Sequence, residues 1–324
     1  MNKQLSAWKL IAKSLQSTTG VVLLYVLESS GSSPGRQGFF MVVTATGEME
    51  GSIGGGIMEH KFVELAKEKL REGNRKSVIK RQVHDKLAAT NQSGMICSGE
   101  QTILLYPVIA KDALVIQQII LTIEQNKNGS LSLSPGQLSF SPSIPAKNFH
   151  FSFISDDDWE YIEKTGYKNQ LFIIGGGHCA LAFSKLMRGM DFYITLFEER
   201  EELYTVVQNE FAHEVIIVDD YSALNNLISS GPNQYAVIMT FGYRTDAVAV
   251  RGLLDKKFTY LGLLGSKSKM KKLLGEFRKE GMAGNVLKKI HAPIGLAINS
   301  QTPEEIAISI AAEIINVKNG IAIN

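Results

Sequence analysis

Apolar and polar residues alternate regularly along the second half of the chain, from Gln170 onward. Short apolar runs that are typical of buried strands are separated by segments with the spacing of amphipathic helices. This alternation predicts a parallel sheet covered by helices on both faces, because parallel strands need long crossover connections. The predicted strands are Leu171–Ile174, Tyr193–Phe197, Val215–Val218, Ala236–Thr240 and Tyr260–Leu264.

The first half of the chain has a different pattern, in which helices and strands are mixed. An amphipathic helix is expected to end before Gly20, and a second helix is expected from Ile57 to about Glu72. The β-rich runs around these helices are Val21–Leu27, Phe39–Thr44, Val78–Val83 and Thr102–Val108. The sequence therefore predicts an N-terminal α+β domain over residues 1–110.

Between the two patterns, residues 111–165 are predicted to form an appendage and linker. A helix is expected over Ala110–Gln125 and a hairpin over Ser130–Ser141. The stretch Asn126–Asn148 is rich in Asn, Gly, Ser and Pro, which favour turns and loops. The run Asp156-Asp157-Asp158 lies near the expected boundary, and residues 166–324 are assigned to a Rossmann-like α/β domain.

Composition and charge restrict the class of protein. The 324 residues, of which 44% are hydrophobic, are enough for about two packed domains. A formal net charge of +2, without a dense Lys/Arg stripe, predicts no nucleic-acid partner. No apolar run approaches the roughly 20 residues of a membrane helix. Because Cys97 and Cys179 form no CxxC pair or disulfide framework, we expect a cytoplasmic protein.

A glycine loop follows the first strand of the predicted parallel sheet. Gly175, Gly177 and Ala180 form a G-x-G-x-x-A pattern that opens a helix, as in dinucleotide-binding folds. Glu198 follows at roughly the 20-residue distance at which a ribose-binding carboxylate is expected. The pattern predicts NAD(P), another nucleotide or a related phosphate-bearing ligand. The alternative is a Rossmann fold without a dinucleotide, in which the glycines serve only the turn.

A second possible anion site in this half lies where another strand ends and a basic helix begins. Gly265, Ser266 and Lys267 stand at that point, and free backbone N–H groups at a helix start can hold an anion. The alternative is an ordinary solvated helix face. The sequence Thr302-Pro303-Glu304-Glu305 predicts a capping box and is assigned a structural role.

Two glycine-flanked polar loops make the first half a candidate ligand site. So many glycines indicate positive φ angles or the close approach of a ligand or another backbone segment. An arginine in such a loop suits a phosphate-like group. The alternative is a tight bend that is needed only for packing. The candidate binding residues are Ser32, Ser33, Arg36, Gly54, Gly55, Gly56 and Glu59.

No constellation for acid–base or nucleophilic catalysis is present in the sequence. The histidines are scattered without a zinc signature, and neither a P-loop nor a nucleophile elbow occurs. Cys97 has small neighbours, and its thiolate can bind a soft metal, so it is the candidate metal ligand and a further cofactor-binding residue. The alternative for Cys97 is a buried small hydrophobe.

Several sequence blocks in order resemble the xanthine dehydrogenase accessory factor (XdhC/CoxI) family, which includes carbon monoxide dehydrogenase accessory proteins. The resemblance covers nearly the whole chain. Its blocks are Gly31-Ser32-Ser33-Pro34 with Arg36, Gly51–Gly56 with Glu59, Cys97-Ser98-Gly99-Glu100, the Gly175 loop, Tyr260–Lys267, Ile290–Leu296 and the helix Thr302–Ile315. The chain differs from the usual family pattern at Ser98, at Phe241-Gly242-Tyr243-Arg244 and at Ala297-Ile298-Asn299.

The resemblance implies a cofactor chaperone without catalytic residues of its own. Members of the family bind the molybdenum cofactor, a molybdopterin that bears a dithiolene and a phosphate. They support exchange of an oxo for a sulfido ligand with a cysteine desulfurase, and they deliver the cofactor to an apo molybdenum hydroxylase of the xanthine dehydrogenase type. A homodimer is the expected assembly, since ligand sites favour interfaces. The alternative function is an NAD(P)-dependent oxidoreductase or nucleotide sensor that uses the Rossmann-like domain.

Overall fold

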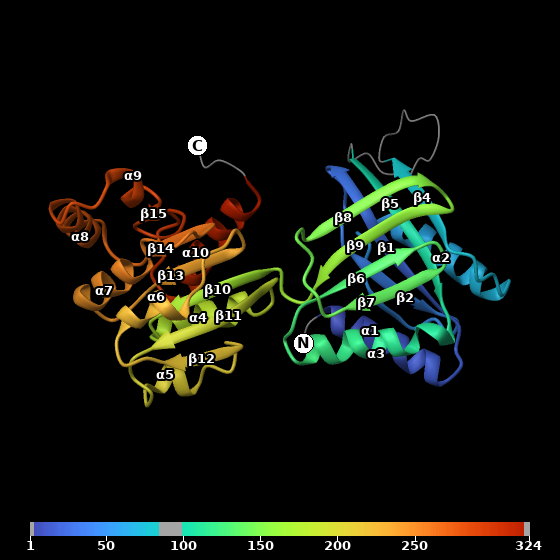
Figure 1. The fold of residues 1–324 in the computed structure, drawn as a ribbon, viewed down its shortest axis with the longest axis horizontal. Coiled ribbons are helices and arrows are strands. Elements are labelled where there is room, and N and C mark those ends of the chain that lie inside the picture. Colours follow the sequence, from blue (N-terminus) through green and yellow to red (C-terminus); the bar gives the residue numbers. More distant parts are fainter. Residues whose placement is uncertain (1–2, 84–98, 321–324) are drawn as a thin grey trace. The chain divides into compact units, whose positions relative to one another are not determined.

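The computed structural model describes residues 3–83 and 99–320 and divides the chain into two compact units (Figure 1). The first unit ends at Gly166, and the second begins at Tyr167. The predicted α/β class, with a parallel Rossmann-like sheet covered on both faces and an α+β first half, is confirmed. No helix among the described residues is both long enough and apolar enough to span a bilayer.

The first unit is built around a five-stranded antiparallel sheet. Its elements are α1 (Lys3–Gln16), β1 (Val21–Gly31), β2 (Phe40–Thr44), β3 (Met49–Gly51), α2 (Gly56–Arg71), β4 (Val78–Val83) and β5 (Gly99–Val108). The strand order is β3-β2-β1-β5-β4. Successive residues of a strand face opposite sides, so Val22 and Leu24 pack with Phe62 of α2, whereas Leu23 and Tyr25 face the other core.

Residues 111–165 form part of this first unit, and their prediction as an appendage and linker is wrong. They contain most of η1 (Ala110–Asp112), then α3 (Ala113–Glu124), β6 (Gly129–Ser134), β7 (Gln137–Ser141), β8 (Phe149–Ser155) and β9 (Asp158–Thr165). The strands make an antiparallel sheet in the order β7-β6-β9-β8. Ile119, Leu131 and Tyr161 share one buried core with Trp8 and Leu104. Burial of this apolar surface joins the second sheet to the first.

A buried carboxylate stands in the middle of this shared core. Glu163 of β9 is 1% exposed and accepts hydrogen bonds from the hydroxyls of Tyr25 (2.6 Å) and Tyr161 (2.7 Å). Burial and the Glu163 carboxylate raise the pKa of both tyrosines well above the usual value, so both hydroxyls keep their protons. Because Tyr25 belongs to β1, this network connects the two sheets.

The second unit has the strand order of a doubly wound dinucleotide-binding fold. Its first elements are β10 (Asn169–Ile174), α4 (His178–Met187), β11 (Phe192–Glu198), α5 (Tyr204–Val207), β12 (Glu214–Ile217), η2 (Tyr221–Ala223) and α6 (Leu224–Leu227). They are followed by β13 (Gln234–Ile238), α7 (Tyr243–Leu253), β14 (Tyr260–Leu263), α8 (Lys267–Lys279), α9 (Gly284–Leu287), β15 (Ile290–His291) and α10 (Pro303–Lys318). The parallel order β12-β11-β10-β13-β14-β15 places the switch point between β10 and β13.

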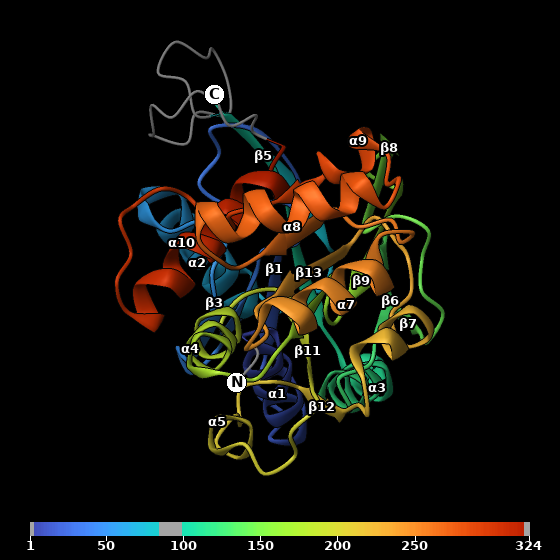
Figure 2. The ribbon, with the colours of Figure 1, turned by 90° about the vertical axis from the view of Figure 1, so that its left-hand side faces the viewer.

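Helices cover both faces of the parallel sheet. α4 and α10 pack against each other on one face, where Phe183 and Ile310 are buried. α7 and α8, both visible in Figure 2, contribute Val250 and Leu273 to the core on the other face. The predicted capping box of α10 is confirmed, since Thr302 and Glu305 bond to each other's backbone N–H groups.

The first prediction concerns the tyrosine–carboxylate network. Tyr161→Phe removes one donor to the buried Glu163 carboxylate, and we expect it to lower the free energy of unfolding by about 1.5–3 kcal/mol. Both tryptophans of the chain, Trp8 and Trp159, are buried in the first unit, so tryptophan fluorescence in a urea titration follows this unit. Ser143→Ala, which removes an exposed side-chain hydroxyl of the same unit, is the control. Equal effects of the two substitutions would contradict the network's role.

The second prediction concerns pH. His213 Nδ1 accepts the N–H of Ile194 (2.9 Å), and burial together with the Arg188 charge lowers the pKa of His213 to about 4. Because the unfolded chain binds this proton near pH 6.5, stability from His213 is complete above that pH and is lost toward pH 4. Thermal unfolding followed by circular dichroism should therefore depend less on pH in His213→Gln than in the wild type. His178→Gln, at an exposed histidine, should keep the wild-type slope.

Candidate functional site

The two glycine-flanked loops of the first unit lie in direct contact. A Cβ atom at Gly35 would stand 2.0 Å from the carbonyl oxygen of Ile53, which shows how closely the loop backbones approach. The buried side chain of Gln101 donates to the carbonyl oxygens of Gly35 (3.0 Å) and Ile53 (3.1 Å). The predicted polar loop and the predicted glycine run therefore form one structure, which Gln101 fastens to β5.

The glycine run needs its glycines for conformation and for space. Gly54, Gly55 and Gly56 have φ angles of +130°, +77° and +70°, which L side chains rarely adopt. A Cβ at Gly54 would also stand 2.5 Å from the amide nitrogen of Gly35, whereas one at Gly55 would meet nothing within 4 Å. Gly54 is thus required by packing against the neighbouring loop, while Gly55 borders open space.

Glu59 turns back onto the glycine run. Its Oε2 accepts hydrogen bonds from the Ser52 hydroxyl (2.6 Å) and from the backbone N–H groups of Ile53 (2.9 Å) and Gly55 (3.0 Å). These are amide donors of the kind that form an anion-binding concavity. The carboxylate of the chain itself occupies them, so Glu59 shapes the loop.

The remaining predicted residues of the first unit differ in accessibility. Ser32 and Arg36 are exposed, and Arg36 is steadied by a bond from its Nη1 to the carbonyl oxygen of Gly31 (2.9 Å). Ser33 is buried and donates to the carbonyl oxygen of Gly35 (2.9 Å). Cys97, the predicted metal ligand, lies outside the described residues. Within those residues, no group of three or more His, Cys, Asp and Glu side chains could hold a metal ion.

A cleft of about 400 Å³ begins beside these loops. Its wall includes Ser30 and Glu100, which pair across β1 and β5 next to the pair Gly31 and Gly99. The other side chains that matter for its chemistry are Glu28, Arg81, Phe151, Phe153 and Asp156. The cleft combines aromatic rings with the Arg81–Glu100 ion pair and the carboxylates of Glu28 and Asp156, a composition that suits a small organic ligand. The sequence did not indicate it, because β8 was not predicted.

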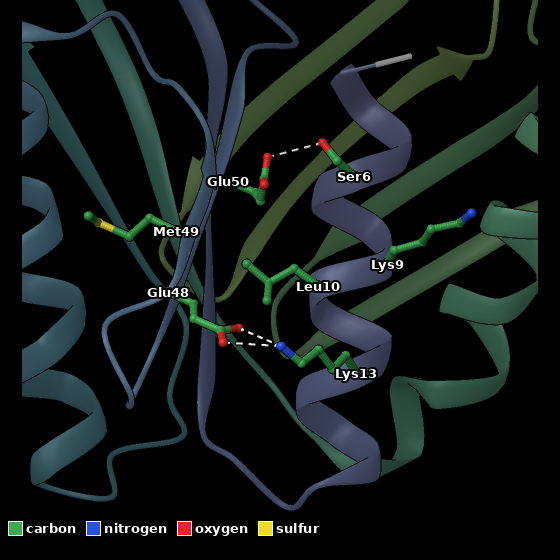
Figure 3. Close-up of a pocket in the computed structure, with 7 residues that line it drawn as sticks. All are labelled: Ser6, Lys9, Leu10, Lys13, Glu48, Met49 and Glu50. Carbon is green, nitrogen blue, oxygen red and sulfur yellow. Dashed lines mark hydrogen bonds and ion pairs between the residues drawn. The ribbon is translucent and has the colours of Figure 1, made fainter. Parts of the chain in front are cut away.

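A second groove in this unit, of about 550 Å³, lies between α1 and the segment of β3 (Figure 3). Its charged groups are already paired: Lys13 contacts Glu48 (3.1 Å), and Glu50 accepts from the Ser6 hydroxyl (3.1 Å). Lys9 pairs with Glu124 (2.7 Å). No residue predicted to bind a ligand lines this groove, and its internal pairing leaves little charge for one.

The glycine loop of the second unit fits tightly between neighbouring elements. Gly175 has a φ of +102°, and a Cβ there would stand 2.5 Å from the carbonyl oxygen of Met239, just after β13. A Cβ at Gly176 would stand 2.3 Å from the side chain of Val206. Around Gly177 nothing lies within 4 Å of such an atom, and Ala180 is fully buried. The open part of the loop is therefore at Gly177, where α4 begins.

The Glu198 carboxylate, predicted to bind ribose, is turned into the protein. The side chain is fully buried, and its Oε2 accepts the Gly176 N–H (2.6 Å) and Arg200 Nη2 (3.0 Å). Its Oε1 accepts Arg200 Nε (2.9 Å) and the backbone N–H groups of Glu199 (3.0 Å) and Arg200 (3.2 Å). Glu198 thus supports the loop and holds Arg200, a residue that sequence reasoning missed.

At the other predicted anion site, the helix start is capped by its own side chain. Ser266 accepts the backbone N–H of Lys269 (3.2 Å), and Lys267 is exposed. A Cβ at Gly265 would stand 2.8 Å from the side chain of Lys269. Lys269 forms an ion pair with the fully buried Asp246 of α7, whose other oxygen accepts the Thr240 hydroxyl (2.6 Å). This buried pair was not predicted either.

The fold and these loops define a protein with a Rossmann-type unit and an α+β unit that carries its own glycine loops. Residues 171–314 match the XdhC Rossmann domain, and residues 14–81 match the XdhC and CoxI family. The chain belongs to the XdhC and CoxI family.

Three proteins illustrate what the chain is similar to. It is 25% identical over 315 residues to the uncharacterized protein YqeB of Escherichia coli, covering 95% of this chain and 45% of that protein. It is 26% identical over 163 residues to a Bacillus subtilis protein named as a probable xanthine dehydrogenase component, covering 50% and 47%. The matched part of the chain spans less than half the length of each of these two relatives. A crystal structure described as a xanthine dehydrogenase from Bacillus halodurans shares the fold, with a TM-score of 0.69, 21% identity and coverage of 99% and 97%.

The third prediction compares two glycines of one loop. Gly54→Ala places a Cβ against backbone at a positive φ, so we expect it to lower the free energy of unfolding of the first unit by about 2 kcal/mol or more. Gly55→Ala should lower it by only about 1 kcal/mol, the cost of an L residue at a positive φ, because the added Cβ meets no other atom. Urea titrations followed by tryptophan fluorescence measure both. An equal or reversed order would show that contact between the loops is not what requires Gly54.

Proposed function

We propose that this chain is a maturation factor for a molybdenum hydroxylase of the xanthine dehydrogenase type, and that its first unit binds the molybdenum cofactor. The observation that carries the proposal is the convergence of the family's sequence blocks on one place in that unit. The loop with Arg36, the glycine run and the start of β5 lie together there. Family membership and the names of two similar proteins support the link to xanthine dehydrogenase.

The charges at the converging loops fit an anionic ligand. Arg36 is exposed beside the loops and can donate to a phosphate or to a dithiolene-bound metal centre. α2 begins at Gly56 without a side-chain cap, so the first amides of this helix are available beside the open space at Gly55. Glu59 occupies only the Ile53 and Gly55 amides. In this proposal Ser32, Arg36 and the Gly56 amide hold the anionic end of the cofactor.

The neighbouring cleft fits the pterin end. Phe151 and Phe153 offer ring faces on which a planar pterin can stack, and Glu28 and Asp156 can accept its N–H groups. The cleft includes Ser30 and Glu100, which adjoin Gly31 and Gly99 of the loop region. One elongated ligand could therefore reach from the cleft to Arg36. The molybdenum cofactor, with a flat ring at one end and a phosphate at the other, has the matching chemistry.

The proposed role is protective and non-catalytic. The protein would hold the cofactor while a cysteine desulfurase supplies sulfur, and until an apo-hydroxylase accepts it. Both partners would then contact the first unit, where the bound cofactor must remain accessible. A homodimer belongs to the same proposal.

The fourth prediction tests binding directly. Molybdenum cofactor released anaerobically from a molybdenum hydroxylase is mixed with the full chain, and bound molybdenum is measured after ultrafiltration. We expect Arg36→Ala to weaken binding about tenfold, the loss of one charge-assisted contact. Phe153→Ala should weaken it several-fold by removing a stacking surface.

The controls are exposed residues of the same unit. Arg75→Ala removes another exposed arginine, and Ile154→Ala removes the 78% exposed neighbour of Phe153 that does not line the cleft. Both should bind like the wild type. Absence of binding by the folded wild type, or equal losses in the test and control variants, would overturn the proposal.

A further inference from the structure

Two side chains meet across the glycine loop of the second unit. β10 lies between β11 and β13, so residues that follow β11 and β13 can meet only across the end of β10. Arg200 follows β11, Phe241 follows β13, and the guanidinium carbon of Arg200 stands 4.5 Å from the centroid of the Phe241 ring. The pair therefore spans the switch point, where Rossmann folds bind their ligands.

Arg200 is held in one orientation. Its Nε and Nη2 donate to the two oxygens of Glu198, at 2.9 and 3.0 Å, and Phe241 supports a face of the guanidinium. The side chain remains 41% exposed. Its third nitrogen, Nη1, has no hydrogen-bond partner among the residues that the structure describes. Arg200 thus presents a fixed pair of N–H donors to an incoming ligand.

Glu198 stays ionised in spite of its burial. Desolvation raises the pKa of this carboxyl, but the hydrogen bonds from Arg200 and from the Gly176 amide outweigh desolvation and leave the pKa below its usual value. The buried negative charge keeps the guanidinium in place. Because both oxygens are engaged within the protein, this carboxylate has no acceptor to offer to ribose hydroxyls.

The chemistry at this position therefore favours a phosphate over a free diol. In dinucleotide-binding folds, an acidic side chain here accepts the ribose hydroxyls, whereas a nearby arginine accommodates a 2′-phosphate. Phe241, 67% exposed, offers a ring surface for a purine. At Gly177 there is open space before the first turn of α4, which has no side-chain cap and can receive a diphosphate.

We propose that the second unit binds a dinucleotide of the NADP class, and that Arg200 selects it through its 2′-phosphate. This inference goes beyond the proposed function, because it concerns the other unit and requires no molybdenum cofactor. A positive or negative result at Arg200 leaves the Arg36 experiment unaffected.

The test is isothermal titration calorimetry of the full chain with four probes: NADP⁺, NAD⁺, adenosine 2′,5′-bisphosphate and inorganic phosphate. We expect NADP⁺ to bind at least about tenfold more tightly than NAD⁺, since the two differ only in the 2′-phosphate. The bisphosphate should compete with NADP⁺, because it carries the adenosine half with the same phosphate. Competition by inorganic phosphate as strong as that by the bisphosphate would show a simple anion site and overturn the nucleotide assignment.

Three variants separate recognition from folding. Arg200→Lys keeps the positive charge beside Glu198 but loses the planar set of N–H donors of the guanidinium. We expect the preference for NADP⁺ over NAD⁺ to fall below about threefold. Phe241→Ala, which removes an exposed ring, should weaken the binding of NADP⁺ and of NAD⁺ by similar factors. Arg251→Lys is the matched control, because Arg251 also donates Nε and Nη2 to one carboxylate, Glu280, and is 41% exposed.

The outcomes decide the proposal. An unchanged preference in Arg251→Lys together with a reduced one in Arg200→Lys supports it, provided that circular dichroism shows both variants folded. Binding of NAD⁺ as tight as that of NADP⁺, an unaltered preference in folded Arg200→Lys, or no dinucleotide binding by the wild type at millimolar concentration would overturn it.

Discussion

A carboxylate that accepts backbone amide hydrogens holds a glycine loop in place in each unit. A tight turn leaves N–H groups without partners, and such groups are costly unless they are satisfied. Glu59 satisfies the amides of Ile53 and Gly55, and Glu198 satisfies that of Gly176. Each loop is thereby fixed without a ligand. The surrounding elements can pack closely against it, as Val206 does against Gly176.

This arrangement changes which groups can recognise a ligand. Because the carboxylates use part of the loop amides, we propose that ligand recognition depends on exposed cations beside the loops, Arg36 in the first unit and Arg200 in the second. Elsewhere in the second unit, buried carboxylates also orient side chains that carry nitrogen groups. Asp246 holds Lys269, and Glu313 holds His291 (3.1 Å) while it also accepts the Gly295 N–H (2.7 Å). Side chains held in this way lose little conformational freedom on binding.

Sequence periodicity predicted most of the helices and strands, because apolar residues recur at one spacing in a partly buried helix and at another in a buried strand. Strand β4 has the predicted bounds, and the hairpin of β6 and β7 lies where turn chemistry placed it. The prediction failed for residues 111–165, which were assigned to an appendage and linker in part because Asn126–Asn148 is rich in turn-forming residues. The segment Phe149–Ser155 alternates aromatic and polar residues, as an edge strand does, and Asp156-Asp157 is simply the turn before β9. The alternation of aromatic and polar residues was therefore a better guide to this segment than its polar composition.

The sequence predicted which types of residue form the candidate sites, but it did not predict the direction in which their side chains point. Spacing places Glu198 at the end of β11, yet spacing is the same whether a carboxylate faces a ligand or the loop. The direction depends on packing: Val206 fills the space beside Gly176, and Thr205 bonds to the Gly176 carbonyl oxygen, so the amide of this residue points at Glu198. Those contacts come from α5, a helix that is too short to produce a recognisable spacing of apolar residues in the sequence. Once Glu198 turns inward, Arg200 must accompany it, since a buried carboxylate needs a counter-charge. The residue that we propose to face the ligand is therefore Arg200, two positions beyond the one that spacing indicated.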